Sequence, residues 1–587
     1  MTGAKRSSRL YPCGLYTTLG VVACIGFAVA VWDLTLGGFY FRVLGVRISS
    51  WEVYKPFRIG MVAIVAAIAI RDRWAESTQT SWNAIDRWSR WIAGAVAIVS
   101  VAIAVHWGVF AAGGADAYGY VSQAALWAQG RLSAPDPLAM VASIVGPAAA
   151  PLGYQMSTVA GSMVPVYPPG LPLLMAIAIR VGGPSAAYLV VPLLGGLAVW
   201  LTYLLGLRIA DARAGVVAAM LVAFTPIFMF QSLEPMSDVP ATAWWLLAWV
   251  LVLSPGGASP FLAGLAVSAA LLTRPNLVPL AALLVPIAAA TAPRRRRAML
   301  LAAGLIPGCI AVAALNAYWY GGPLRSGFGP LDAFYAWNHF FPNLRRDWNW
   351  MIELDASVIL LAAAAPWMIR DKTTAAAILT FFAALIGCYA FYLVYDDWPF
   401  FRFLLPGLPL MIALAAAVIV RILSWLPLSS RGAVVFLLCT LVPIEGVLTA
   451  DRHTVFDIQR GEHRYVAVGE AIGARLPANA VVLSVIQSGS VRMYGQRPTV
   501  RWDRLEPERL DATLDGLRAA GYAPYLLLES WEDSLFRARF TGTRALREAD
   551  RAPVIEYYGP ISVRVLRLDD EVHCGERRVL PRAVPAP

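Results

Sequence analysis

The chain has 587 residues, of which 58% are hydrophobic and only 14% are charged. This composition supplies too little polar surface for a soluble globular protein, so the sequence predicts an integral membrane protein. The formal net charge of +11 does not indicate nucleic acid as a partner, because the basic residues cluster in short turns between apolar runs, as in cytoplasmic loops. The six cysteines offer neither a disulfide framework nor a metal quartet.

The first three apolar runs set the predicted topology. A run over residues 10–32 is long for a signal peptide and predicts a retained helix, preceded by Lys5, Arg6 and Arg9. Runs over 57–70 and 91–110 predict two further helices. The positive-inside rule places the connection between them inside, since it carries Arg71, Arg73, Arg87 and Arg90. The third helix therefore ends on the outer side.

A glycine-rich stretch after the third helix presents a carboxylate on that outer side. Asp116 begins a predicted short helix that lies along the membrane surface and that Gly130 can end. Asp116 could cap this helix or act on a substrate, and its spacing favours neither interpretation. The one apolar piece that follows, residues 171–181, is too short to span a membrane and predicts a re-entrant or interfacial segment.

Later apolar runs complete a predicted bundle of about thirteen membrane spans. These runs cover residues 186–207, 214–230, 239–253, 260–273, 276–291, 298–318, 355–369, 374–395, 403–423 and 431–449. Threading them alternately places every basic cluster on the inner side, namely Arg208 with Arg213, the arginines at 294–297, Arg370 with Lys372, and Arg421 with Arg431. One alternation satisfies the positive-inside rule throughout.

The predicted fold is therefore an all-α polytopic membrane protein with a small C-terminal α/β extramembrane domain. Residues 1–90 are predicted to form an N-terminal transmembrane hairpin with a cytoplasmic connection. Residues 91–449 form the transmembrane catalytic part, and residues 450–587 form the outer α/β domain. In this tail, helical stretches alternate with β-rich runs, the helices over 460–475 and 507–520 and the β-rich runs over 481–486, 525–528, 554–558 and 562–566.

A second acid, Asp238, also begins a helix on the outer side. Alone it is as good a candidate for a helix start as for a functional residue, because Asp before Val-Pro is typical of helix N-termini. The joint placement of Asp116 and Asp238 at outer helix ends, with no competing catalytic set, favours a shared site. Glu234, four residues earlier, is a further candidate.

Few basic residues lie on the outer side, and these are candidate ligand-binding groups. Arg402 could clamp a lipid phosphate through paired hydrogen bonds, or could pair with Asp396 or Asp397. Arg274 interrupts an apolar run, and a charge near membrane depth costs at least about 2.5 kcal/mol, so we expect a partner or a ligand for it. His339 is a candidate site residue or a buried structural histidine.

Short motifs follow one another along residues 91–425 in an order that suggests a family. They are Asp116 with Tyr120, then Tyr167-Pro168-Pro169-Gly170-Leu171-Pro172, Glu234-Pro235-Met236-Ser237-Asp238, Leu272-Thr273-Arg274-Pro275 and Arg402-Phe403-Leu404-Leu405-Pro406. In order and sidedness they resemble the membrane glycosyltransferases of the GT-C fold, in the branch that contains protein O-mannosyltransferases and the aminoarabinose transferase of lipid A.

The resemblance implies roles for these residues. It implies an essential first-loop carboxylate, a second outer acid and a sugar donor on polyprenyl phosphate, roles that fall on Asp116, Asp238 and the phosphate-facing Arg402. The remaining candidates, predicted to bind substrate, are Arg274, His339, Glu234 and Tyr120. Relatives often carry a second acid beside the first, but here that position is Ala117. A divalent metal therefore stays an open alternative that no acidic pair supports, and its ligands are unknown.

The sequence thus predicts an inverting glycosyltransferase of the inner (plasma) membrane. It would move a sugar from a polyprenyl-phosphate donor to a lipid, glycan or protein acceptor of the cell envelope, on the outer face. Two alternatives stay open. A secondary transporter would also have about a dozen helices, although such proteins place polar residues near the bilayer midplane. The other alternative is a non-enzymatic envelope assembly protein whose tail binds partners.

Overall fold

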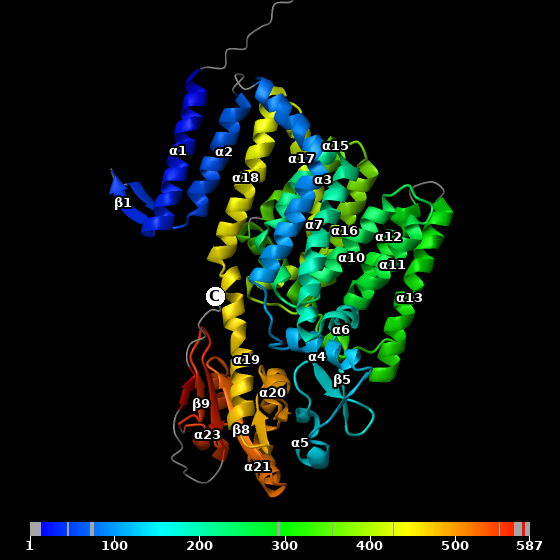
Figure 1. Ribbon diagram of the computed structural model, residues 1–587, viewed down its shortest axis with the longest axis vertical. Helices are drawn as coiled ribbons and strands as arrows, with labels where there is room; N and C mark the ends of the chain where they lie inside the picture. The colour runs from blue at the N-terminus through cyan, green and yellow to red at the C-terminus, as the bar shows by residue number, and fades with distance from the viewer. Residues whose placement is uncertain are drawn as a thin grey trace, which may run out of the picture.

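The computed structural model describes residues 13–43, 46–70, 75–289, 294–354, 356–426, 428–550, 552–568 and 578–580. Helices dominate the molecule, and they gather in its upper part in Figure 1, while a sheet of strands lies at the lower end. The predicted topology rests partly on Lys5, Arg6, Arg9, Arg71 and Arg73, which lie outside the described residues.

Six helices of the described chain are long and apolar enough to cross a membrane, and three bent helix pairs raise this number to nine. The six are Thr17–Leu36, Asn83–His106, Pro184–Ile209, Arg295–Tyr320, Lys372–Ala390 and Val434–Arg452. The bent pairs are Ala212–Ala223 with Pro226–Leu233, Trp337–Glu353 with Ala356–Met368, and Trp398–Leu404 with Leu408–Leu423. The chain is therefore a multi-pass membrane protein.

The predicted count of about thirteen spans exceeds these six to nine because several apolar helices are short. The helices α10 (Asp238–Val252), α11 (Ser259–Thr273) and α12 (Val278–Ala289) have 15, 15 and 12 residues. At 1.5 Å per residue they rise about 18–22 Å, less than the roughly 30 Å of a bilayer core. A helix packed inside a protein is as apolar as one facing lipid, so hydropathy alone cannot separate the two.

The core of the helical part is formed by helices that other helices surround. In α10, Trp245 and Trp249 are fully buried and meet Phe381 of α16 (Lys372–Ala390) edge-on, with ring centroids 5.2 and 5.5 Å apart. Helix α7 (Val190–Ile209) packs against α10, and α8 (Ala212–Ala223) and α17 (Leu408–Leu423) pack against α7. Aromatic contacts of this kind fix the helices relative to one another.

The other helices and strands of this part follow in chain order. Before the core lie α1 (Cys13–Leu36), the hairpin of β1 (Phe39–Val43) and β2 (Val46–Ser50), α2 (Tyr54–Ile70) and α3 (Ala75–His106). Within and after it lie α9 (Pro226–Leu233), α13 (Arg294–Tyr320), α14 (Phe340–Glu353), α15 (Ala365–Met368) and α18 (Leu428–Arg452). The predicted domain boundaries at 90/91 and 449/450 lie inside α3 and α18. The helix α3 begins before its apolar run, and α18 continues beyond its own.

After α18 the chain forms a mixed sheet with helices, which we call the C-terminal unit (residues 458–580). Its strand order is β11-β9-β10-β8-β6-β7, and β8 is parallel to β6 but antiparallel to β10. The strands are β6 (Ala480–Leu483), β7 (Thr499–Val500), β8 (Ala523–Glu529), β9 (Ile555–Tyr557), β10 (Val563–Arg567) and β11 (Arg578–Leu580). The helices are α19 (Ile458–Arg475), α20 (Ser488–Gly495), α21 (Leu510–Ala519), α22 (Glu532–Arg539) and α23 (Arg544–Glu548).

The segment between α3 and α7 packs against the C-terminal unit. Its Leu138, Val141 and Val145 share one hydrophobic core with Val481 and Leu483 of β6. In Figure 1, α5 and β5 accordingly lie beside α20 and α21. The elements of this segment are α4 (Asp116–Ala128), α5 (Ala142–Val145), α6 (Gly170–Gly182) and a small sheet of β3 (Ala134–Pro135), β4 (Tyr154–Met156) and β5 (Ser162–Pro165).

The helix α4, predicted to lie along the membrane surface, is packed into the protein. Protein surrounds it on most sides, and its buried residues include Tyr118, Tyr120, Gln123 and Leu126. Gly130 follows it with φ +76°, the left-handed conformation that glycine adopts most readily after a helix, as the sequence predicts. Tertiary packing therefore holds α4 in place.

Candidate active site

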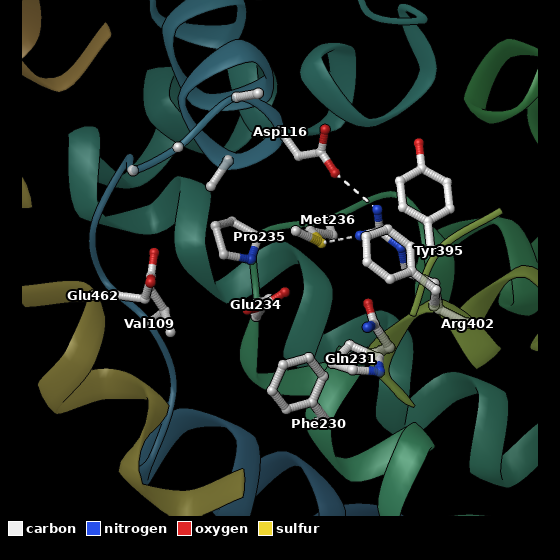
Figure 2. A pocket seen from close by; sticks show the side chains of 16 residues that line it. Val109, Asp116, Phe230, Gln231, Glu234, Pro235, Met236, Tyr395, Arg402 and Glu462 are labelled. Carbon is white, nitrogen blue, oxygen red and sulfur yellow. Dashed lines mark hydrogen bonds and ion pairs between the residues drawn. The ribbon is translucent and has the colours of Figure 1, made fainter. Parts of the chain in front are cut away.

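A cavity of about 440 Å³ lies where the helical part meets the C-terminal unit. Its walls come from the start of α4, the end of α9 and its connection to α10, the 3₁₀ helix Trp398–Leu404 and the second turn of α19. Figure 2 shows Asp116, Glu234, Gln231, Arg402 and Glu462 around this space.

Asp116 begins α4 but does not cap it. The N-cap position is Ala115, and no side chain caps the helix. Instead, Oδ1 of Asp116 accepts a hydrogen bond from the Tyr167 hydroxyl at 2.6 Å, and Oδ2 accepts one from Arg402 Nη2 at 3.1 Å. The cap interpretation is therefore wrong. The side chain stays 31% exposed, and it faces the cavity.

Asp238 also begins its helix without capping it, since α10 has Ser237 at the N-cap position and no side-chain cap. Its Oδ1 accepts a hydrogen bond from Arg274 Nη2 at 2.5 Å, and its Oδ2 lies 3.9 Å from Arg402 Nη1. The side chain is 1% exposed. Asp238 is thus the partner that the sequence predicts for Arg274, which also donates to Ser237 and to the Tyr389 hydroxyl.

Arg402 lies between the two carboxylates. Besides Asp116 and Asp238, its guanidinium contacts the Met236 sulfur, and it packs over the rings of Phe400 and Phe403 with centroid distances of 5.2 and 5.6 Å. Its buried Nε has no hydrogen-bond partner among the described residues.

The alternative predicted for Arg402 was pairing with Asp396 or Asp397, and the structure contradicts it. Asp396 is bound by Arg346. Asp397 accepts from the backbone N–H of Trp398, at the start of the 3₁₀ helix that carries Arg402.

These four side chains form an alternating charge array, Asp116–Arg402–Asp238–Arg274. Burying an isolated charge in apolar surroundings costs about several kcal/mol of free energy. In this array each charge lies beside one of opposite sign, which offsets that cost. Among the described residues there is no group of three or more His, Cys, Asp or Glu side chains that could hold a metal ion. The array can orient a carboxylate toward the cavity and present positive charge beside it.

The other three predicted residues differ in how they relate to the array and to the cavity. Glu234 lines the cavity, and burial, together with the nearby Glu462 carboxylate, raises the pKa of Glu234 to about 8. Tyr120 lies behind Asp116, where its hydroxyl donates to Ser237 Oγ at 2.9 Å and its ring packs on Tyr167. His339 does not line the cavity, and its Nδ1 lies 3.2 Å from the backbone oxygen of Phe391.

Three residues of the site were not predicted from the sequence. Tyr167 holds Asp116, Gln231 lines the cavity, and Glu462 reaches it from the C-terminal unit. Tyr167 stands in a motif that carried the family resemblance, and Gln231 interrupts an apolar run, so both left a signal in the sequence. Glu462 left none, because it lies in an ordinary polar helix more than 200 residues beyond Asp238.

No family model and no curated protein matches the chain. Among solved structures, ArnT from Cupriavidus metallidurans bound to undecaprenyl phosphate superposes with a TM-score of 0.51 at 12% identity, covering 80% of this chain and 97% of that chain. The same protein in the apo state superposes with a TM-score of 0.50 at 11% identity, with the same coverage of both chains. An oligosaccharyltransferase from Archaeoglobus fulgidus, tethered with an acceptor peptide, has a TM-score of 0.49 at 12% identity. This match covers 79% of this chain and 72% of that chain.

At such identities the likeness concerns the fold. The chain has the GT-C fold, and this confirms the resemblance that the motifs predicted. The similarity extends over 97% of ArnT and 80% of this chain, so the two proteins share most of their architecture.

Proposed function

We propose that the chain is an inverting glycosyltransferase that moves a sugar from a polyprenyl-phosphate donor to an acceptor of the cell envelope. The observation that carries this proposal is the charge array, which places the partly exposed Asp116 and the buried Asp238 on either side of Arg402 beside a cavity. The fold shared with ArnT, whose solved structure holds undecaprenyl phosphate, supports the donor class.

In the proposed reaction the acceptor hydroxyl attacks the anomeric carbon of the donor sugar. A new C–O bond forms there while the bond from that carbon to the phosphate oxygen breaks, which inverts the configuration. Asp116 takes the hydroxyl proton, since each of its oxygens keeps a lone pair beyond the hydrogen bonds from Tyr167 and Arg402. A positioned base of this kind contributes about 10²- to 10⁴-fold to the rate.

The leaving group is the lipid phosphate, whose charge must be stabilised as the bond breaks. Arg402 is the cation of the cavity wall, and its Nε–H has no partner among the described residues. That N–H can donate to a phosphate oxygen while Nη1 and Nη2 stay with the two aspartates. Asp238 and Arg274 then keep Arg402 in place.

The proposal includes a sidedness. The cavity, the segment between α3 and α7 and the C-terminal unit would lie on the outer face of the inner membrane, and the arginines at 294–297 in the cytoplasm. Reporter fusions after Arg297 and after Leu568 test this arrangement. Equal reporter signals at the two points would overturn it.

The function is tested with purified protein in proteoliposomes that contain polyprenyl-phosphate donors with radiolabelled sugars, incubated with envelope extract. We expect label to move from lipid to an extract component with stoichiometric release of polyprenyl phosphate, and Asp116→Asn to lower this transfer about a hundredfold or more. Movement of intact solute across the membrane without transfer of label would support a transporter instead. Neither transfer nor transport, with envelope proteins bound to the C-terminal unit, would favour an assembly protein.

A further inference from the structure

The C-terminal unit contributes a side chain to the cavity. Glu462 lies in the second turn of α19 and lines the cavity together with Asp116, Gln231 and Glu234. Figure 2 shows Glu462 and Arg402 on opposite sides, with Glu234 between them. The cavity therefore has a cationic wall in the helical part and a carboxylate wall that the C-terminal unit completes.

A buried ionic network holds Glu462 in this position. Its Oε1 accepts from Arg464 Nη1 at 2.9 Å, and Arg464 Nε donates to Glu529 Oε1 at 2.8 Å. Glu529 is fully buried at the end of β8 and also accepts from Gln487 and from the Trp531 indole. Charges this deep are expensive unless each is paired, so the network fixes Glu462 firmly relative to the sheet.

The helices α19 and α20 also fix the segment that leads to Asp116. A Cβ atom on residue 113 would come within 2.0 Å of the Tyr465 ring, so only glycine fits at position 113. The Gln459 amide donates to the Gly108 oxygen at 2.9 Å, and the Ala112 N–H donates to the Tyr494 hydroxyl at 2.8 Å. Glu462 and Asp116 are therefore held in one register by contacts with the C-terminal unit.

A second, independent feature of the cavity points to a ligand. Gln231 is fully buried and lines the cavity, yet neither its Oε1 nor its Nε2 has a hydrogen-bond partner among the described residues. Leaving a buried amide unpaired costs about 1–3 kcal/mol, so such a group is expected to find its partner in whatever occupies the cavity.

We propose that Glu462 and Gln231 form a subsite for sugar hydroxyl groups, which the C-terminal unit completes. A carboxylate accepts from hydroxyls, and an amide both donates and accepts, so together they match neighbouring hydroxyls on a sugar ring. Arg402, on the opposite side, faces the phosphate end of the same donor. This subsite deepens the proposed glycosyltransferase function and rests on it.

The experiment measures the contribution of the sugar to binding. Full-length protein in nanodiscs is titrated with bare undecaprenyl phosphate and with a series of undecaprenyl-phosphate sugars, and the ratio of the two Kd values gives the sugar increment. Glu462→Gln should reduce this increment about tenfold, the loss of a charge-assisted hydrogen bond, and leave the Kd of the bare lipid unchanged. Gln231→Met should reduce it in the same direction.

Glu470→Gln is the matched control, because Glu470 lies on the same helix and is exposed to solvent. It should leave both Kd values unchanged. The subsite is overturned if Glu462→Gln keeps the wild-type increment, if it weakens bare lipid equally, or if the wild type shows no increment with any sugar. The transfer assay judges the proposed function separately, because label transfer by a wild type without a sugar increment would leave that function intact.

Discussion

Two helix starts, those of α4 and α10, look alike in the sequence and differ in the structure. Each begins with an aspartate that a sequence pattern would assign to capping, and neither aspartate caps. Asp116 is 31% exposed to the cavity, whereas Asp238 is 1% exposed and meets two guanidinium groups. From this difference in burial we propose that Asp116 meets the substrate and that Asp238 holds the two arginines.

The sharpest test of this difference is the stability of Asp238→Asn. The substitution leaves Arg274 and Arg402 sharing the charge of Asp116 alone, with Arg274 buried beside a neutral amide. Breaking a buried ion pair from one side typically costs 3–5 kcal/mol, and we expect about 3 kcal/mol here because Asn can still accept one hydrogen bond. Thermal unfolding of the protein in detergent measures the change.

The comparison itself supplies the control, because Asp116→Asn should unfold at nearly the wild-type temperature. A stable Asp238→Asn protein that had nevertheless lost transfer would show that Asp238 acts on the substrate directly. The roles assigned from burial would then be wrong.

The activity of Asp116→Asn is the second test. Asn keeps the size of the side chain, and its one oxygen can still accept from Arg402 while its NH2 group donates to the Tyr167 oxygen, but it cannot take a proton at neutral pH. We expect transfer to fall about a hundredfold or more, with insertion and thermal stability retained. Near-normal transfer by the purified variant would end the role of Asp116 as the base.

Arg402→Lys should have a smaller effect. Lysine keeps the positive charge but cannot reach Asp116, Asp238 and a phosphate oxygen at once, because it lacks the planar fork of the guanidinium. We expect about a tenfold loss in kcat/KM for the lipid donor, mostly in KM. Arg346→Lys, which alters the exposed pair with Asp396, is the control and should leave donor use unchanged. An unchanged KM in Arg402→Lys would limit Arg402 to holding the aspartates.

The sequence allowed us to single out candidate site residues, but it did not predict which side chains contact one another. Asp116, Asp238, Arg274 and Arg402 stand out because polar groups beside long apolar runs are rare, and the array unites these four. Their pairing depends on the packing of segments up to 286 residues apart, the separation of Asp116 from Arg402, and no local pattern encodes that. The capping alternative for Asp116 and Asp238 was wrong for the same reason, since tertiary ion pairs outweighed the local interaction.

The class of fold could be predicted from the sequence, but the number of membrane-spanning helices could not. Apolar runs identify helices, but they do not tell whether lipid or protein surrounds a helix, as the buried tryptophans of α10 show. Glu462 and Gln231 lay beyond prediction for a different reason. A glutamate in a polar helix is ordinary, and an unpaired amide can be recognised only when its surroundings are known.

The smallest expected effect concerns the hydrogen bond that distinguishes Asp116 from Asp238, the one donated by Tyr167. Tyr167→Phe removes only the hydroxyl, so the ring keeps its packing on Tyr120 and Phe328. Arg402 still holds the other carboxylate oxygen, and the carboxylate gains freedom to turn. We therefore expect kcat to fall about threefold to tenfold, as for one lost hydrogen bond to a charged group, with the donor KM unchanged.

Tyr320→Phe is the matched control for this last substitution. The Tyr320 hydroxyl donates at 2.6 Å to the backbone oxygen of Pro165, two residues before Tyr167, so its loss perturbs the same loop without touching the carboxylate. If Tyr320→Phe lowers kcat as much as Tyr167→Phe does, the effect comes from the loop, and the hydroxyl of Tyr167 has no special part in orienting Asp116. If only Tyr167→Phe lowers kcat, the exposed aspartate needs a second anchor that the buried one obtains from its arginines.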